Sequence, residues 1–441
     1  LAQPPAQPPA ALALAGRIEF GNALAGPLDR GALPVTALRS GLRWSAAEGL
    51  ALDGADLELA GGGRIRGDAR LDPSRTVTLP GLSMPWLAFD LQVAGLDLAA
   101  LHGGLPRSAL RGRADGDGQR FDVDLGDAAR NGVSLQARGR IDEARLELER
   151  ALLAGGEGFG GLRLSAAGRV GVRAPHELAL EGEFERLDPA RLLALGGAAA
   201  PAATPRSGRT SAPARAAQTP GAPGTAAGAP SPGAPSSGAE PAGDSPLAQL
   251  HGALDGRWSL RGQLPATPSS ADAAGLQLRL EIARGELAGM PVRAQLSTRL
   301  LGVAVEGLSP ERLRVRGAVA DASLGGTRLS ARGDLGAAGD RLDFQLRAPS
   351  LAPLAGLLGQ PGLAGTLQAD GALRGAIAEP ALSLRAQGAK LALGESARVG
   401  SLSLDLDLPS PARGLFESPF TLALQARDLA SGALELRSLR I

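Results

Sequence analysis

Short runs in which apolar and polar residues alternate are the feature that most constrains the fold of this chain. Residues 276–282 read Leu-Gln-Leu-Arg-Leu-Glu-Ile, and residues 402–408 read Leu-Ser-Leu-Asp-Leu-Asp-Leu. Similar runs cover 121–125, 342–346 and 434–436. A β-strand turns successive side chains to opposite faces, so a period of two separates apolar from charged residues. The pattern predicts an antiparallel sheet with one wet face and one apolar face.

Turn residues separate the alternating runs. Residues 121–125 and 133–140 flank Asn131-Gly132, which predicts a β-hairpin. Arg-Gly pairs such as Arg66-Gly67 and Arg111-Gly112 recur along the chain. We expect them at strand ends, because Gly permits a positive φ and Arg keeps the end solvated. The recurrence has no fixed period, which argues against a solenoid of regular repeats.

Helices are expected to be few and short. Residues 188–195 begin with Asp188 at the N-cap and Pro189 at the first helical position. Residues 96–101 and 350–358 have a similar character and also follow strand-like runs. We interpret all three as short plugs between batches of strands.

One segment has a different composition from the rest. Residues 197–245 are almost wholly Pro, Ala, Gly, Ser and Thr, so they offer too little apolar area to offset chain entropy. We predict a disordered linker there. It divides the chain into two β-rich segments, 1–196 and 246–441.

The charge balance and composition exclude several classes of protein. The 441 residues carry 46 basic and 45 acidic side chains, a formal net charge of +1 without a strongly basic block, which argues against a nucleic-acid partner. The absence of cysteine excludes disulfides and thiolate metal sites. Aromatic residues make up only 2%, so the apolar surface is Leu, Val and Ala. No run approaches the ~20 apolar residues that span a bilayer.

Motifs that resemble reactive or binding sites have simpler interpretations as turns. Residues 156–161 match GxGxxG, but a strand pattern follows where a dinucleotide site needs a helix. Residues 115–118 read Asp-Gly-Asp-Gly without the Glu that closes a calcium loop, and a hairpin turn is expected. The histidines, His102, His176 and His251, lie far apart in the sequence. We therefore predict no enzymatic activity, no cofactor and no metal site.

Several segments together resemble a known family. They are residues 362–375, 380–388, 399–405, 184–190 and 254–262. In these the chain resembles TamB, the translocation and assembly module family, within the wider AsmA-like group. The resemblance implies an elongated, curled (taco-like) β-sheet with an apolar inner groove. It also implies an inner-membrane anchor at the N-terminus and a C-terminal domain at the outer membrane. This chain would be a middle section lacking both ends, and the 197–245 insert departs from the family pattern.

The resemblance implies function in the Gram-negative periplasm. The family is associated with phospholipid transfer to the outer membrane, with assembly of outer-membrane proteins, and with an Omp85-type barrel partner. We expect phospholipid acyl chains to lie along an aliphatic groove. One alternative is a scaffold that offers sheet edges to nascent outer-membrane β-barrels. Another is an inert structural β-protein. From the pattern alone, a closed sandwich or β-helix would also satisfy the alternation.

The apolar positions of the alternating runs are the candidate groove lining. They are Phe121, Val123, Leu125, Leu276, Leu278, Leu280, Ile282, Leu313, Val315, Leu342, Phe344, Leu346, Leu402, Leu404, Leu406, Leu408, Leu422 and Leu424.

Overall fold

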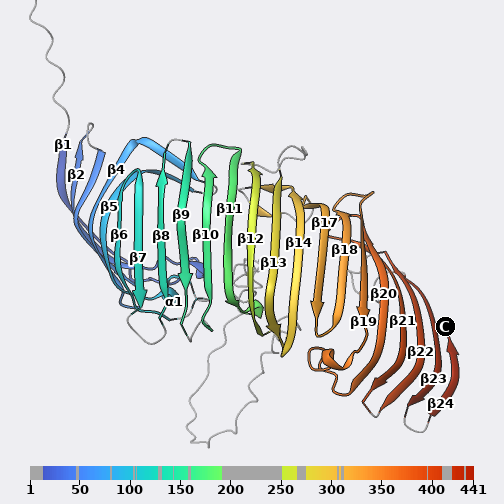
Figure 1. Ribbon diagram of the computed structural model, residues 1–441. Helices are drawn as coiled ribbons and strands as arrows, with labels where there is room; N and C mark the ends of the chain where they lie inside the picture. Colours follow the sequence, from blue (N-terminus) through green and yellow to red (C-terminus); the bar gives the residue numbers. More distant parts are fainter. Residues whose placement is uncertain are drawn as a thin grey trace, which may run out of the picture.

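A single antiparallel sheet of 22 strands makes up nearly the whole structure (Figure 1). The structure is a computed structural model. It describes residues 13–45, 49–79, 82–102, 105, 107–127, 132–142, 144–156, 160–190, 251–265, 275–304, 307–308, 312–394, 396–409, 420–431 and 434–441. Within these residues each strand pairs with its neighbours in the chain, from β1 (Ala13–Gly21) to β24 (Leu434–Arg440). The described ladder contains no pairing between β1 and β24, so the curled sheet is open. A closed sandwich is thereby excluded, and the predicted fold class is confirmed.

The first half of the ladder runs from β1 to β11. Its further strands are β2 (Val35–Ser45), β3 (Gly49–Leu59), β4 (Arg64–Leu79), β5 (Leu82–Leu96), β6 (Leu110–Asp117), β7 (Arg120–Asp127), β8 (Ser134–Ile141), β9 (Arg145–Ala154), β10 (Arg163–Gly171) and β11 (His176–Leu187).

The second half runs from β12 to β24. Its strands before β24 are β12 (Gly252–Leu264), β13 (Leu276–Leu287), β14 (Met290–Leu301), β17 (Arg314–Leu324), β18 (Thr327–Leu335), β19 (Arg341–Ala348), β20 (Leu363–Arg374), β21 (Ala381–Leu393), β22 (Ala397–Leu408) and β23 (Thr421–Ser431). The short pair β15 (Val303–Ala304) and β16 (Gly307–Leu308) lies between β14 and β17, which pair directly.

The two halves are joined strand to strand. β11 pairs antiparallel with β12 from His176 opposite Leu264 to Leu187 opposite Leu254. The β-rich segments 1–196 and 246–441 are therefore continuous through this ladder. The predicted linker, residues 197–245, lies outside the described residues.

The predicted hairpin and the helix predicted within residues 96–101 are present, whereas of residues 188–195 the structure describes only 188–190. β7 and β8 pair in register, with Val123 opposite Ala137. Asp97 caps α1 (Leu98–Leu101) by accepting the Ala99 backbone N–H at 3.0 Å. Asp188 accepts the Ala190 N–H at 3.1 Å where a helix begins at residue 189. In the third segment the structure has a 3₁₀ turn, η4 (Ala352–Leu354); another, η1 (Leu28–Arg30), follows β1 and was not predicted.

The Arg-Gly pairs correct one prediction. Arg66-Gly67 and Arg111-Gly112 lie inside β4 and β6, not at their ends. Gly67 and Gly112 have φ values of 151° and 155°, and a Cβ on either would collide with a carbonyl oxygen of the adjacent strand. Gly262 and Gly333 repeat this arrangement in β12 and β18. Glycine inside a strand marks a bend or a close approach of two backbones, so these residues accommodate curvature.

Aromatic rings lie across glycines of neighbouring strands. Gly116 is opposite both Phe89 and Phe121, and a methyl group at Gly116 would come within 2.9 Å of the Phe89 ring. A methyl group at Gly139 would likewise come within 2.7 Å of the Phe121 ring. The absence of a side chain at each glycine therefore leaves room for an aromatic ring of the neighbouring strand.

A small compact core closes one end of the N-terminal strands. Leu59, Val93, Leu96, Leu110, Leu125 and Val133 are buried together there. Leu98 and Leu101 of α1 pack against them. Burying a leucine side chain fully stabilises a fold by about 1.5–3 kcal/mol, so this cluster holds β3 to β8 at that end.

The aromatic rings that lie across glycines make a testable prediction. The substitution Gly116→Ala should destabilise the protein by about 1–2 kcal/mol in urea unfolding, because the new methyl group displaces the Phe89 ring. Gly126→Ala is the matched control, since a Cβ on Gly126 in β7 meets nothing within 4 Å. Equal stability of the two variants would contradict the ring-over-glycine packing.

Candidate functional site

The apolar face of the sheet is the candidate site. Across it, directly paired residues form a row that we call the continuous row, with one residue from each of 21 successive strands, β1 to β23. All are Leu, Ile, Val, Phe, Ala or Gly. The row is Phe20, Leu38, Leu57, Ile65, Val93, Gly112, Leu125, Leu135, Leu153, Leu164, Phe184, Gly256, Ile282, Ala294, Ala322, Leu329, Leu346, Ala369, Ala386, Leu404 and Leu424. The backbone of Leu424 then pairs with Ile441.

A second apolar row runs beside the continuous row from β11 to β23. Its members are Gly182, Trp258, Leu280, Leu296, Ala320, Ala331, Phe344, Gly371, Leu384, Leu406 and Leu422. The two rows are two residues apart along each strand. The apolar face is therefore a band rather than a single line.

The structure brings most of the predicted lining residues onto this face. Leu125, Ile282, Leu346, Leu404 and Leu424 belong to the continuous row. Four more belong to the second row: Leu280, Phe344, Leu406 and Leu422. A further eight lie at alternating strand positions on the same face: Phe121, Val123, Leu276, Leu278, Val315, Leu342, Leu402 and Leu408. Their cross-strand partners are apolar or small, except for Thr298 opposite Leu278. Leu313 precedes β17 and is outside the ladder.

The face remains partly open to solvent. Fourteen of the eighteen predicted residues are half-buried. Leu125, Leu276 and Leu408 are buried, and Leu422 is 37% exposed. Leu329 of the continuous row is 44% exposed. A sealed core buries such side chains almost completely, and half-exposed leucines in a continuous band are unusual in a monomeric protein.

The polar residues on this face mostly direct their hydrogen bonds into the backbone. The Ser40 hydroxyl donates to the Gly41 carbonyl at 2.8 Å, and the Thr298 hydroxyl donates to the Arg316 carbonyl at 3.3 Å. His176 is buried, with Nδ1 at 2.7 Å from the Gly171 carbonyl oxygen. These contacts satisfy polar groups that would otherwise make the band less apolar.

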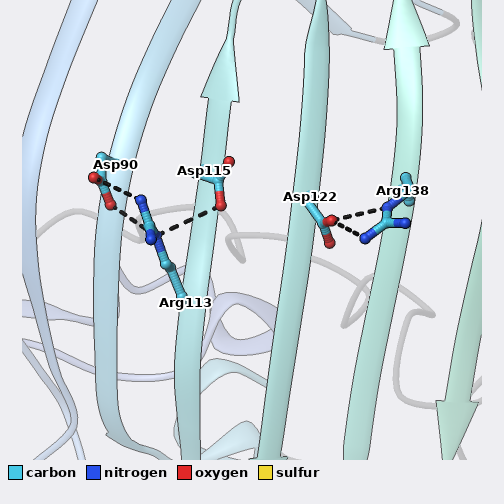
Figure 2. Close-up of polar contacts among 5 residues, drawn as sticks. All are labelled: Asp90, Arg113, Asp115, Asp122 and Arg138. Atoms are coloured by element: carbon cyan, nitrogen blue, oxygen red, sulfur yellow. Dashed lines mark hydrogen bonds and ion pairs between the residues drawn. The ribbon is translucent and has the colours of Figure 1, made fainter.

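The opposite face carries charged pairs that bridge neighbouring strands. Figure 2 shows Arg113 reaching Asp90 through two hydrogen bonds of 3.1 and 2.9 Å, and Arg138 bound to Asp122. Asp90, Asp115 and Asp122 are direct partners on three successive strands. Like charges in that register repel, so the arginines offset a cost of sheet pairing.

Two such pairs shift the titration of their carboxyl groups. The hydrogen-bonded Arg64 guanidinium, with Nε at 2.5 Å from Asp56, lowers the pKa of Asp56 below its ordinary value. Arg43 lowers the pKa of Asp53 in the same way. In the turn after β6, backbone N–H groups of Arg120 and Gln119 lower the pKa of Asp117. The hairpin turn predicted at residues 115–118 lies at residues 117–120, because Asp115 and Gly116 belong to β6.

Sequence reasoning missed part of the continuous row. Its alanines and glycines, such as Ala294, Ala369 and Gly256, are too small to stand out as apolar positions. The signal was nevertheless present, because residues 292–296 read Val-Arg-Ala-Gln-Leu, in which Ala keeps the period of two. The N-terminal members, including Phe20 and Leu57, were not among the predicted residues.

These features define a class of protein: an open, curled, single-ladder antiparallel sheet with one continuous apolar face. Residues 244–441 match the family described as TamB, N-terminal domain. The match covers just under half of the chain and supports a relationship of this part to the TamB family, whose members belong to the Gram-negative envelope. Neither a curated protein nor a solved structure matches the chain. Among the described residues, no helix combines the length and apolar character needed to span a bilayer.

The lowered pKa of Asp56 predicts an acid-dependent loss of stability. A carboxyl whose pKa is lower in the folded state stabilises the fold fully above its unfolded value of about 3.9 and ceases to do so as the pH falls through the folded value. The thermal midpoint, followed by circular dichroism, should therefore fall below about pH 4. Asp56→Asn and Arg64→Gln should each flatten that decline. An unchanged decline in both variants would show that this pair does not contribute.

Proposed function

We propose that this chain is a segment of a lipid-carrying bridge in the periplasm, in which the apolar face holds phospholipid acyl chains while the head groups stay in water. The continuous row is the observation that carries the proposal. An acyl chain crossing water exposes its CH₂ groups at ~0.8 kcal/mol each, on the order of 12 kcal/mol for a 16-carbon tail. The apolar band removes most of that cost along the ladder, except around Val93 and Leu125, which the compact core buries.

The length of the ladder supports a bridge rather than a pocket. Strands pair about 4.8 Å apart, so a path across 22 strands extends on the order of 100 Å. Small and aliphatic side chains contact a hydrocarbon tail without directional preference. A lipid therefore meets similar surroundings at successive strands and can move without a deep energy minimum. We expect the protein to be anchored at the inner membrane and to work with an Omp85-type partner.

Photo-crosslinking tests which molecule occupies the apolar face. A photoreactive side chain at Leu404, in the continuous row, should form phospholipid adducts in cells. The same group at Asp405, the next residue and on the opposite face, is the matched control. Protein adducts without lipid at Leu404 would favour the scaffold for outer-membrane barrels. The absence of both lipid and protein adducts at Leu404 would contradict the lipid proposal.

A charge on the path should block transport. Leu280→Glu places a carboxylate in the second row, and a barrier raised by 1.4 kcal/mol or more slows movement at least about tenfold. Arg279→Glu puts the same charge on the solvent face of the same strand. We expect only the first to lose phospholipid transfer and envelope integrity in cells that lack the wild-type protein. Full function of a stably expressed Leu280→Glu variant would refute conduction along this face.

A further inference from the structure

One hollow on the described surface lies in the second half of the sheet. It has a volume of about 750 Å³ and spans β13 to β19. Three arginines line it, Arg293, Arg328 and Arg347, together with Asp321 and Gln345. The volume falls within the usual range of small-ligand sites.

Strand register places the three arginines together. Arg328 is the direct partner of Arg347, and Ser323 stands between Arg293 and Arg328. Direct partners across an antiparallel pair have Cβ atoms about 5 Å apart, so the Arg328 and Arg347 guanidinium groups share one region of the surface. All three side chains are exposed.

The Arg328–Arg347 pair lacks the compensation seen at similar positions. Five directly opposed arginine pairs occur in the described ladder: Arg120–Arg140, Arg138–Arg150, Arg299–Arg316, Arg341–Arg374 and Arg328–Arg347. In the first four, Arg140, Arg138, Arg316 and Arg341 each form an ion pair with a carboxylate. Within the described residues, neither Arg328 nor Arg347 has a carboxylate within 4.0 Å, and Arg293 also lacks one.

The hollow as a whole is positively charged. Glu281 lines it but is already paired with Arg257, at 2.9 Å. Asp321 is then the one remaining carboxylate among the residues lining the hollow, against three arginines. Like charges in direct register destabilise a sheet unless something neutralises them. The described residues supply no further counter-charge here, which leaves a place for an external anion.

We propose that Arg293, Arg328 and Arg347 form a binding site for a phosphate-bearing anion. The guanidinium fork matches phosphate oxygens and donates two hydrogen bonds to them at once, which a single point charge cannot do. Ser323 and Gln345 add neutral donors at the rim. Because the arginines are exposed, binding weakens as salt increases. The three arginines alternate along their strands with Ala294, Leu329 and Leu346 of the continuous row, so their side chains lie on the face opposite the apolar band. Four residues of the continuous row, Ile282, Ala294, Ala322 and Leu329, also line the hollow. Anion binding by the arginines does not depend on lipid conduction.

Inorganic pyrophosphate is the first probe, measured by isothermal titration calorimetry at low ionic strength. The double variant Arg328→Gln/Arg347→Gln should bind pyrophosphate at least about tenfold more weakly than wild type. Without ligand, the double variant should be at least as stable as wild type, because the substitutions remove the repulsion between the two guanidinium groups. Arg398→Gln/Arg427→Gln is the control, because it removes two exposed arginines from β22 and β23.

A second probe distinguishes a lipid head group from a soluble phosphate. Retention on vesicles of phosphatidylglycerol and phosphatidylcholine is compared with retention on pure phosphatidylcholine. If retention on the anionic vesicles alone needs Arg328 and Arg347, the natural ligand is a head group; if only pyrophosphate binding needs them, it is soluble. The proposal is overturned if wild type binds neither probe, if the double variant binds as wild type does, or if the control variant weakens binding equally.

Discussion

Register in an antiparallel ladder is the constraint on which the rest of this structure depends. Because side chains alternate, a slip of one residue between any two strands would turn an entire run of leucines to the solvent. The ladder avoids such slips over 21 strand-to-strand steps, and where it shifts by a residue the extra residue is absorbed in a bulge, as between Asp255 and Gly256. The apolar band and the charged outer face are two results of the same pairing.

The cross-strand ion pairs and the glycines assist this register in different ways. Arg257 with Glu281 and Arg385 with Asp405 join direct partners on the outer face, so each pair is formed only in the correct register. Exposed ion pairs contribute little to stability singly, and their value here is selectivity among registers. The glycines inside strands permit the close approach of backbones that a curled sheet needs. Together they give a curved sheet that keeps one face apolar.

The sequence predicted the strands, the hairpin at β7 and β8, and the separation of faces, because a period of two is a local property. It could not predict that the sheet stays open, since the same alternation fits a sandwich. Most Arg-Gly pairs were placed wrongly because a positive φ at glycine is compatible with both a turn and a bent strand, whereas Arg374-Gly375 does stand at the end of β20. The continuous row depends on which residue faces which across strands. That register becomes visible only when pairs such as Ala294 with Ala322 are aligned.

The order of the strands in the ladder also bears on how such a protein folds and lengthens. Each strand contacts chiefly its neighbours in the chain, so the contacts are local and the topology has low contact order for a β-protein. Stability in such arrays accumulates unit by unit, and folding can spread from any nucleus to the next hairpin. A protein of this type can thus gain or lose hairpins, and with them reach, while its cross-section stays the same.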